Sequence, residues 1–399
     1  MSMTNELRKL FASRRDGHSL PRELYLDPAV HEFDLRAVFE RNWLQACLET
    51  EIPKPGDYVT VAVGETSIVV LRNHDGEIGA FFNTCRHRGA QICREKQGHA
   101  VRLVCPYHHW SYDLRGKLVQ APRMHDGFDP NGYRLRPVKV ERVCGLVFVC
   151  LGDDPPDFEP FRAALEPMLA PHELHNAKLV HTATYSEQAD WKLVMENARE
   201  CYHCRSGHPQ LMKSFRDFTV KEATPPQWEV EFNERCASRG LKTGEMIGPW
   251  YEIGRYALSD NVFSYTMDGR PAVRKTLGKV GDGDVGTMWW GVQPNGFNHV
   301  VGDYGFFFQC WPTGPRKTTV TGKWIVHKDA VEGVDYDLQR LTEVWHATND
   351  QDRMLAENNQ RGVNSIAYEP GPYSQVTEQL VLRFVDFYCA AARSYLNGK

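Results

Sequence analysis

The chain has 399 residues, 42% of them hydrophobic and 25% charged, and a formal net charge of −4. This composition predicts a soluble protein of two or three domains, with no basic field for nucleic acid and no apolar run long enough to span a membrane. An odd number of cysteines, eleven, and the lack of an apolar N-terminal segment predict a reduced, cytoplasmic chain without a disulfide scaffold.

The sequence predicts helices in its first 42 residues and short strands after them. Residues 1–42 carry apolar side chains at helical spacing, as at Leu7, Leu10 and Phe11. Residues 43–154 show short apolar runs between glycine-containing turns, and Asp57–Val63 with Ser67–Leu71 predicts a β-hairpin. Aspartate and proline at 153–157 mark a boundary. We therefore expect a helical segment, an all-β domain and a third domain at 155–399.

Two short loops of the all-β segment carry a metal signature. Cys85 and His87 stand two apart, and after seventeen further residues Cys105 and His108 stand three apart. Two thiolates on one iron and two imidazoles on the other are the ligands of a Rieske [2Fe–2S] cluster. A Cys2His2 zinc site is the alternative, but zinc fingers pair two cysteines and then two histidines, whereas each half here mixes both types. The adjacent His109 is expected to face solvent or to support the cluster.

Residues 155–399 predict a mixed helical and stranded domain. The expected elements are a helix at Phe158–Leu169, a strand at Leu179–Ser186, strands through Phe263–Val326, and long helices at Asp335–Gln360 and Thr377–Leu396. Residues 211–258 have weak periodicity and fit a lid or an insertion. Gly281–Gly286 matches a dinucleotide-binding pattern, but no strand leads into it and no helix follows, so a loop is expected.

The stretch Glu196–His208 holds two carboxylates and two histidines. His203 and His208 are five residues apart, so on one continuous helix they would point about 140° away from each other. We expect a helix from about Asp190 to end here, broken by Gly207 and the following proline, so that both imidazoles reach one metal. Two imidazoles and a carboxylate form the facial set of non-haem Fe(II) oxygen chemistry. The alternative is a polar helix end with two unrelated histidines.

The third metal ligand must come from another part of the chain. Asp350, Asp352 and Glu357 lie on one predicted helix and are the candidates, unless all three are solvated charges. Cys201 and Cys204 match a thioredoxin-like pattern, but they bracket a proposed metal ligand instead of opening a helix after a strand. Redox use of this pair is therefore not expected.

Together, the two motifs resemble the large (alpha) subunit of Rieske non-haem iron oxygenases over nearly the whole chain. The similarity is greatest to the branch that acts on quaternary ammonium compounds, the glycine betaine and proline betaine (stachydrine) monooxygenases. Three stretches carry this closer match: Asn197–His208, Trp324–Tyr336 and Ala347–Ser374. The resemblance implies an α+β fold with an all-β Rieske domain at 43–154. It also implies a catalytic domain at 155–399, with an antiparallel sheet covered by helices and with residues 1–42 packed against it.

The resemblance also implies roles for individual residues. The family has its iron aspartate five residues before a glutamate and eight before a glutamine, so Asp352 is preferred to Asp350. Glu200 stands where the family has a carboxylate that links the cluster of one subunit to the iron of its neighbour. It would form a hydrogen-bonded bridge between His108 and His203. The alternative is a carboxylate that only fixes the tautomer of His203.

The activity implied by the resemblance is a monooxygenase reaction in a homotrimer. A separate NAD(P)H-dependent flavin or iron–sulfur reductase supplies electrons, the [2Fe–2S] cluster passes them to the mononuclear Fe(II), and an N-methyl group leaves as formaldehyde. Aromatic faces suit a quaternary ammonium, and the aromatic-rich segment Trp289–Trp311 is a source of them, although most are expected in the core. The sequence assigns neither the substrate-binding residues nor the particular amine. Aromatic-ring hydroxylation or demethylation on the same fold is the alternative activity. A Rieske electron-transfer protein without catalysis is a less favoured alternative, because such a protein would need far fewer residues than this chain has.

Overall fold

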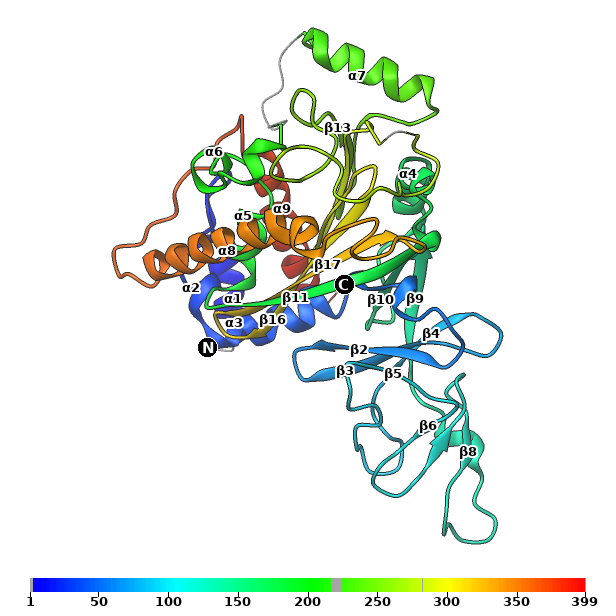
Figure 1. Ribbon diagram of the computed structural model, residues 1–399. Coiled ribbons are helices and arrows are strands. Elements are labelled where there is room, and N and C mark those ends of the chain that lie inside the picture. Colours follow the sequence, from blue (N-terminus) through cyan, green and yellow to red (C-terminus); the bar gives the residue numbers. More distant parts are fainter. Residues whose placement is uncertain (1–2, 217–223, 282, 399) are drawn as a thin grey trace. The chain divides into compact units, whose positions relative to one another are not determined.

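The protein is described from a computed structural model in which residues 3–216, 224–281 and 283–398 are placed (Figure 1). The chain divides into two compact units. The smaller unit is Phe39–Pro156, and the larger unit combines Met1–Val38 with Asp157–Lys399. The N-terminal helices therefore belong to the same unit as the C-terminal part of the chain. No helix among the placed residues is both long and apolar enough to cross a membrane.

The smaller unit is built from antiparallel strands. Its seven-stranded sheet has the order β1-β10-β9-β4-β3-β2-β5, and a second sheet has the order β6-β7-β8. The strands are β1 (Leu44–Leu48), β2 (Asp57–Val63), β3 (Thr66–Arg72), β4 (Ile78–Phe82), β5 (Gln97–His99), β6 (Leu103–Val104), β7 (Ser111–Tyr112), β8 (Leu118–Gln120), β9 (Pro137–Val143) and β10 (Leu146–Cys150). The expected hairpin is confirmed as β2 and β3. Val59, Val61 and Val63 of β2 are buried, as the alternation of a strand with one covered face requires.

A second seven-stranded antiparallel sheet forms the centre of the larger unit. Its order is β11-β17-β16-β15-β14-β13-β12. The strands are β11 (Ala177–Glu187), β12 (Gly244–Ile247), β13 (Tyr251–Tyr256), β14 (Thr287–Val292), β15 (Gly296–Val300), β16 (Tyr304–Gly314) and β17 (Lys317–His327). Residues 304–310 of β16 are all buried, because this strand lies inside the sheet and both of its faces are covered. The expectation of an antiparallel sheet with helices is confirmed.

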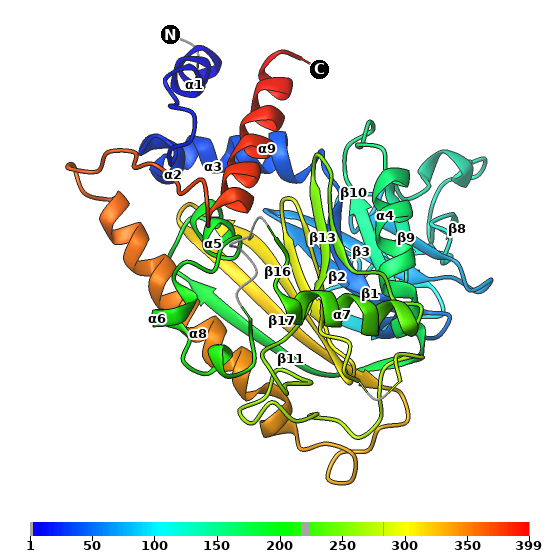
Figure 2. The ribbon, with the colours of Figure 1, turned by 90° about the horizontal axis from the view of Figure 1, so that it is seen from above.

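Helices α5 (Trp191–Asn197), α8 (Leu338–Val363) and α9 (Gln379–Leu396) lie together beside this sheet (Figures 1 and 2). The other helices of this unit are α1 (Met3–Ala12), α2 (Glu23–Leu26), α3 (Pro28–Asp34), α4 (Glu159–Leu169), α6 (Cys204–Gly207) and α7 (Gln227–Ser238). Asp190 caps α5 by accepting from Lys192 N, and Asp337 caps α8 by accepting from Arg340 N.

A buried charge network joins α3 to α5 and α9. Lys192 is fully buried, and its ammonium lies 2.6 Å from Asp34 Oδ2 and 2.8 Å from Asp190 Oδ1. The Tyr388 hydroxyl donates to Asp34 Oδ1 at 2.9 Å, and Trp191 Nε1–H donates to Asp34 Oδ2 at 3.0 Å. Because removing one member would leave a buried charge without a partner, at a cost of about 3–5 kcal/mol, this network fixes the N-terminal helices on α5.

The stretch Glu196–His208 departs from the predicted helix. Helix α5 ends at Asn197, six residues before His203, instead of running on to the metal ligands. The carboxylate of Glu200 accepts from the backbone N–H groups of Tyr202 and His203, which stabilises a turn in place of the helix. A single turn, α6, then separates His203 from His208 and ends at Gly207, as the glycine suggested.

Two further expectations were wrong in part. Residues 211–258 are not a separate lid or insertion, because they supply α7, the edge strand β12 and its neighbour β13; residues 217–223 lie outside the described part. The strands expected from Phe263 begin only at Thr287. The segment before Thr287 folds as a loop that Asp303 holds in place. The Asp303 carboxylate accepts hydrogen bonds from Ser264 Oγ and from the N–H groups of Ala272 and Val273.

Candidate active site

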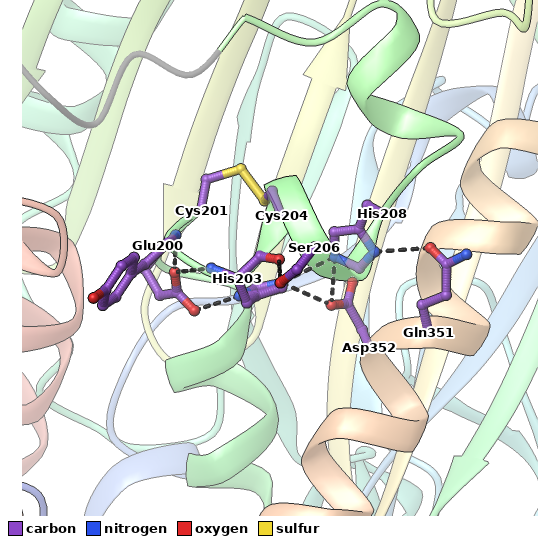
Figure 3. The surroundings of a disulfide bond; sticks show 9 residues. Glu200, Cys201, His203, Cys204, Ser206, His208, Gln351 and Asp352 are labelled. Carbon is purple, nitrogen blue, oxygen red and sulfur yellow. Dashed lines mark hydrogen bonds and ion pairs between the residues drawn. A yellow bond between two sulfur atoms is a disulfide. The ribbon is translucent and has the colours of Figure 1, made fainter.

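Helix α8 and the loop after α5 bring three metal-ligand groups together (Figure 3). His203 and His208 flank α6, and Asp352 projects from α8. The two Nε2 atoms are 2.9 Å apart, and Asp352 Oδ1 lies 3.3 Å from His203 Nε2 and 2.9 Å from His208 Nε2. Asp350, the alternative ligand, pairs with Arg353 instead and is more than half exposed.

The outer nitrogens of both histidines face groups that can only accept. Glu200 Oε1 contacts His203 Nδ1, and Gln351 Oε1 lies 2.9 Å from His208 Nδ1. Each Nδ1 must therefore carry the proton and donate it. The amide nitrogen of Gln351 donates in turn to Gln210 Oε1 at 2.8 Å, which fixes the orientation of the Gln351 side chain. Both Nε2 atoms are left with lone pairs directed at the shared centre.

This centre requires positive charge. Asp352 Oδ1 is buried without a regular hydrogen bond from any described residue. Burial alone would lower the pKa of His203, but Asp352 and Glu200 outweigh it and raise the pKa to about 10. Burial likewise opposes the raised pKa of His208 and the lowered pKa of Asp352, and their mutual contacts again outweigh it. A metal ion can replace these protons and take two nitrogens and one oxygen, so the residues fit a facial Fe(II) site.

Cys201 and Cys204 form a disulfide that brackets His203 (Figure 3). The expectation of reduced cysteines is therefore wrong for this pair. The turn between them brings the two Cα atoms to 4.8 Å, a separation that a disulfide spans. Cys204 Sγ also lies within 4.8 Å of the ligand nitrogens of His203 and His208, but the disulfide occupies this sulfur.

A cavity adjoins the three ligands, and one of its walls is aromatic. Trp289 lies opposite His299, which lies opposite Phe306, and Phe297 lies opposite Phe308 on the neighbouring strands. Because opposite residues share a face of an antiparallel sheet, these five rings form one continuous surface. All five line the cavity. Part of the aromatic segment Trp289–Trp311 therefore faces the metal ligands instead of the core.

Helix α8 supplies a second part of the cavity wall. Trp345, Thr348, Asn349 and Asp352 line the cavity, and their spacing places them on one helix face. The Trp345 ring stacks on Phe306 with centroids 4.4 Å apart, which joins this wall to the sheet. The spacing is visible in the sequence and could have revealed this face once Asp352 was chosen. No sequence signal pairs Gln351 with His208, so that contact was missed.

In the smaller unit, two loops of matching geometry present the four expected cluster ligands. The N–H of Cys85 and that of Cys105 each donate to the carbonyl five residues on, and each cysteine carbonyl accepts from the N–H four residues on. Those N–H groups belong to Gly89 and His109, which both adopt left-handed backbone, with φ of 78° and 59°. The His109 side chain is exposed to solvent, and the residue forms part of the turn through its backbone.

The side chains on these loops suit an iron–sulfur cluster. Cys85 and Cys105 are buried, whereas the rings of His87 and His108 lie near the surface with centroids 4.6 Å apart. Burial raises the pKa of the Cys85 thiol, so a buried thiolate requires a cation such as iron. The Tyr112 hydroxyl lies 3.3 Å from Cys85 Sγ. Two inner sulfurs and two outer imidazoles match a cluster whose two irons have different ligands.

Comparison with known proteins identifies the two domains in which these residues lie. Residues 42–139 match the Rieske [2Fe-2S] domain, and residues 174–393 match the ring hydroxylating alpha subunit (catalytic domain). The glycine betaine monooxygenase oxygenase subunit of Chromohalobacter salexigens is 41% identical over 399 residues, covering 98% of this chain and 89% of that protein. The subunit of the same name from Pseudomonas aeruginosa is 42% identical over 388 residues, covering 95% of this chain and 90% of that protein.

A solved structure extends the comparison to the whole fold. A quaternary ammonium Rieske monooxygenase, described with carnitine oxidation by gut microbiota and inter-subunit electron transfer, aligns with a TM-score of 0.73. The two chains are 22% identical, and the alignment covers 96% of this chain and 98% of the other. The chain belongs to the alpha subunits of the Rieske non-haem iron oxygenases, oxidoreductases that combine a [2Fe–2S] Rieske domain with a mononuclear iron catalytic domain.

Proposed function

We propose that this protein is the oxygenase component of a monooxygenase that removes an N-methyl group from a small quaternary ammonium compound of the glycine betaine or proline betaine type. The aromatic cavity beside the metal ligands carries this proposal. A quaternary ammonium has no N–H to donate, so the faces of aromatic rings are what can attract it. Identities of 41% and 42% to two glycine betaine monooxygenase oxygenase subunits support the choice of substrate.

The residues around the cavity have three different roles in this reaction. His203, His208 and Asp352 hold Fe(II), which when bound supplies the activation of O2. Glu200 and Gln351 keep the Nδ1 protons in place, so that the Nε2 lone pairs remain available to the metal. The aromatic walls hold the trimethylammonium group and exclude water from it.

The proposed reaction balances as a monooxygenation followed by elimination. One oxygen atom of O2 enters a C–H bond of an N-methyl group, and the other leaves as water after taking up two electrons and two protons. The C–N bond of the N-hydroxymethyl product then breaks, with its electron pair passing to nitrogen. The hydroxyl proton is lost, and formaldehyde and a tertiary amine are released.

Electrons require a separate donor and a path between the two metal sites. We assign Cys85, His87, Cys105 and His108 as the cluster ligands and a separate NAD(P)H-dependent reductase as the donor. The relatives' description as an oxygenase subunit supports a separate donor. The path runs from the cluster of one subunit through Glu200 to the iron of its neighbour in a homotrimer in the cytoplasm. The similar solved structure, described with inter-subunit electron transfer, supports a path between subunits.

The test is turnover with defined substrates. The iron-loaded protein, a compatible reductase, NAD(P)H and O2 are supplied with glycine betaine, proline betaine, carnitine, choline or a simple arene. Formaldehyde should appear in step with O2 uptake for one of the two betaines. A cis-diol from the arene, without formaldehyde from any quaternary amine, would contradict the proposal and assign the protein to ring hydroxylation.

A further inference from the structure

Arg199 is a buried cation in the wall of the cavity, one residue before Glu200. Its side chain is 1% exposed. Nη2 donates to Gln293 Oε1 at 2.9 Å and to the carbonyl of Gly296 at 3.0 Å. Nε and Nη1 are buried and have no hydrogen-bond partner among the described residues. Burying N–H groups of a charged side chain without a hydrogen-bond acceptor costs free energy. Nε and Nη1 of Arg199 therefore need an acceptor, and the described residues do not supply one.

The sheet leaves space for this guanidinium beside the aromatic wall. A Cβ at Gly291 of β14 would lie 2.7 Å from Arg199 Nη1, so only glycine admits the side chain in this position. Phe297, opposite Gly291 on β15, has its ring centroid 5.4 Å from Arg199 Cζ. Among the described residues that line the cavity, Arg199 is the single lysine or arginine. The cavity therefore combines one fixed positive group with a surface of aromatic rings.

Within the protein, Glu252 is the carboxylate that could neutralise the positive charge of Arg199. It is buried, and both of its oxygens accept from Gln293 Nε2, at 3.0 and 3.1 Å. The side chain of Gln293 thus links the two by hydrogen bonds, and Glu252 acts on Arg199 through its charge without a direct hydrogen bond. Glu252 can balance charge through space, but it does not satisfy Nε or Nη1.

The geometry points to Arg199 as the residue that binds the carboxylate of a zwitterionic betaine and so selects it over quaternary amines that lack a carboxylate. This inference rests on the proposed function and specifies the substrate class of the same cavity. A substrate carboxylate supplies the acceptor that Nη1 lacks and forms a charge-assisted hydrogen bond. The trimethylammonium end of the same molecule then lies on the aromatic rings, where its methyl groups face the metal ligands.

The experiment compares Arg199→Gln and Arg199→Lys with the wild-type, iron-loaded protein. The matched control is Arg255→Gln, because Arg255 is equally buried but all three of its nitrogens donate to carbonyl groups, and it does not line the cavity. Formaldehyde release gives kcat and KM for glycine betaine and for choline, which has a hydroxymethyl group in place of the carboxylate. Calorimetry measures binding of 3,3-dimethylbutanoate, which has the carboxylate and shape of glycine betaine without the positive nitrogen.

Arg199→Gln should lower kcat/KM for glycine betaine by about 10- to 100-fold, mainly through KM, because a hydrogen bond between charged groups is lost. The value for choline should change little, and 3,3-dimethylbutanoate should bind the wild type but not this variant. Arg199→Lys keeps the charge and should retain part of the preference. Arg255→Gln should lower the melting temperature without changing the ratio of the two kcat/KM values.

The remaining outcomes separate the two claims. An unchanged preference for glycine betaine in folded Arg199→Gln would overturn the role of Arg199 while leaving the proposed function intact. If the wild type releases no formaldehyde from glycine betaine, proline betaine or choline, the proposed function fails; binding of 3,3-dimethylbutanoate that depends on Arg199 would still establish a carboxylate site. If Arg199→Gln does not fold, the double variant Arg199→Gln/Glu252→Gln removes both buried charges and should show the same loss of preference.

Discussion

Gln351 offers the sharpest test of how the protein shapes its mononuclear metal site. His208 is 1% exposed, and its Nδ1–H donates to Gln351 Oε1 at 2.9 Å. In Gln351→Ala this buried N–H loses its acceptor, which costs about 1–3 kcal/mol. The imidazole can then rotate or change tautomer and withdraw its Nε2 lone pair. We expect Fe(II) affinity to fall about 10- to 100-fold, the usual effect of removing a hydrogen bond that orients a metal ligand.

Competition with a chelator of known Fe(II) affinity measures this loss. Gln351→Glu keeps an acceptor at the same place and should bind iron at least as well as wild type. Asp350→Ala on the same helix removes an exposed carboxylate that pairs with Arg353, and should leave affinity unchanged. Wild-type iron affinity in Gln351→Ala would refute the reasoning, and loss of iron in Asp350→Ala would refute the choice of Asp352 as the third ligand.

The other predictions concern the two metal sites and the buried core. His203→Ala should lose the mononuclear iron and turnover but keep the visible and EPR spectra of the cluster, whereas His87→Ala should lose those spectra; a bleached cluster in His203→Ala would contradict two separate sites. Glu200→Gln should slow reoxidation of the reduced cluster in stopped-flow measurements with both sites filled, and Glu200→Ala should slow it more; normal reoxidation would leave Glu200 no coupling role. Burial raises the pKa of Glu196 to about 7, so the folded state binds a proton more tightly than the unfolded state. Its contribution to the free energy of unfolding is therefore full below about pH 4.5 and is lost as the pH rises through 7, by at most about 1.4 kcal/mol per pH unit. Chemical denaturation of Glu196→Gln between pH 5 and 7 should show a flatter dependence, and an unchanged slope would contradict the assignment.

The spacing of residue types along the chain was enough to predict those elements that depend on neighbouring residues. The hairpin of β2 and β3 follows from alternating residues and a tight turn, and the long helix α8 follows from its apolar periodicity. His203 and His208 could be matched to one metal because the break near Gly207 is visible in the sequence. The choice of Asp352 needed the family motif, because the sequence alone does not tell which carboxylate of a helix faces inward.

Features that depend on long-range contacts were not predictable in this way. Arg199 lies in the middle of the recognised stretch, yet its role depends on Gly291 and Gln293, about ninety residues further along the chain. The end of α5 at Asn197 depends on the side chain of Glu200 bonding to the backbone, which competes with helix propensity.

The central claim is that iron held by His203, His208 and Asp352 demethylates a betaine in the aromatic cavity. A single turnover tests it without a reductase: the iron-loaded protein is reduced chemically, freed of reductant, and mixed with O2 and either glycine betaine or proline betaine labelled in its N-methyl groups. The account predicts labelled formaldehyde and the tertiary amine in equal amounts from wild type, and neither product from Asp352→Ala with its cluster intact. Equal yields from wild type and Asp352→Ala, or oxidation of the cluster with no labelled product from either betaine, would contradict it.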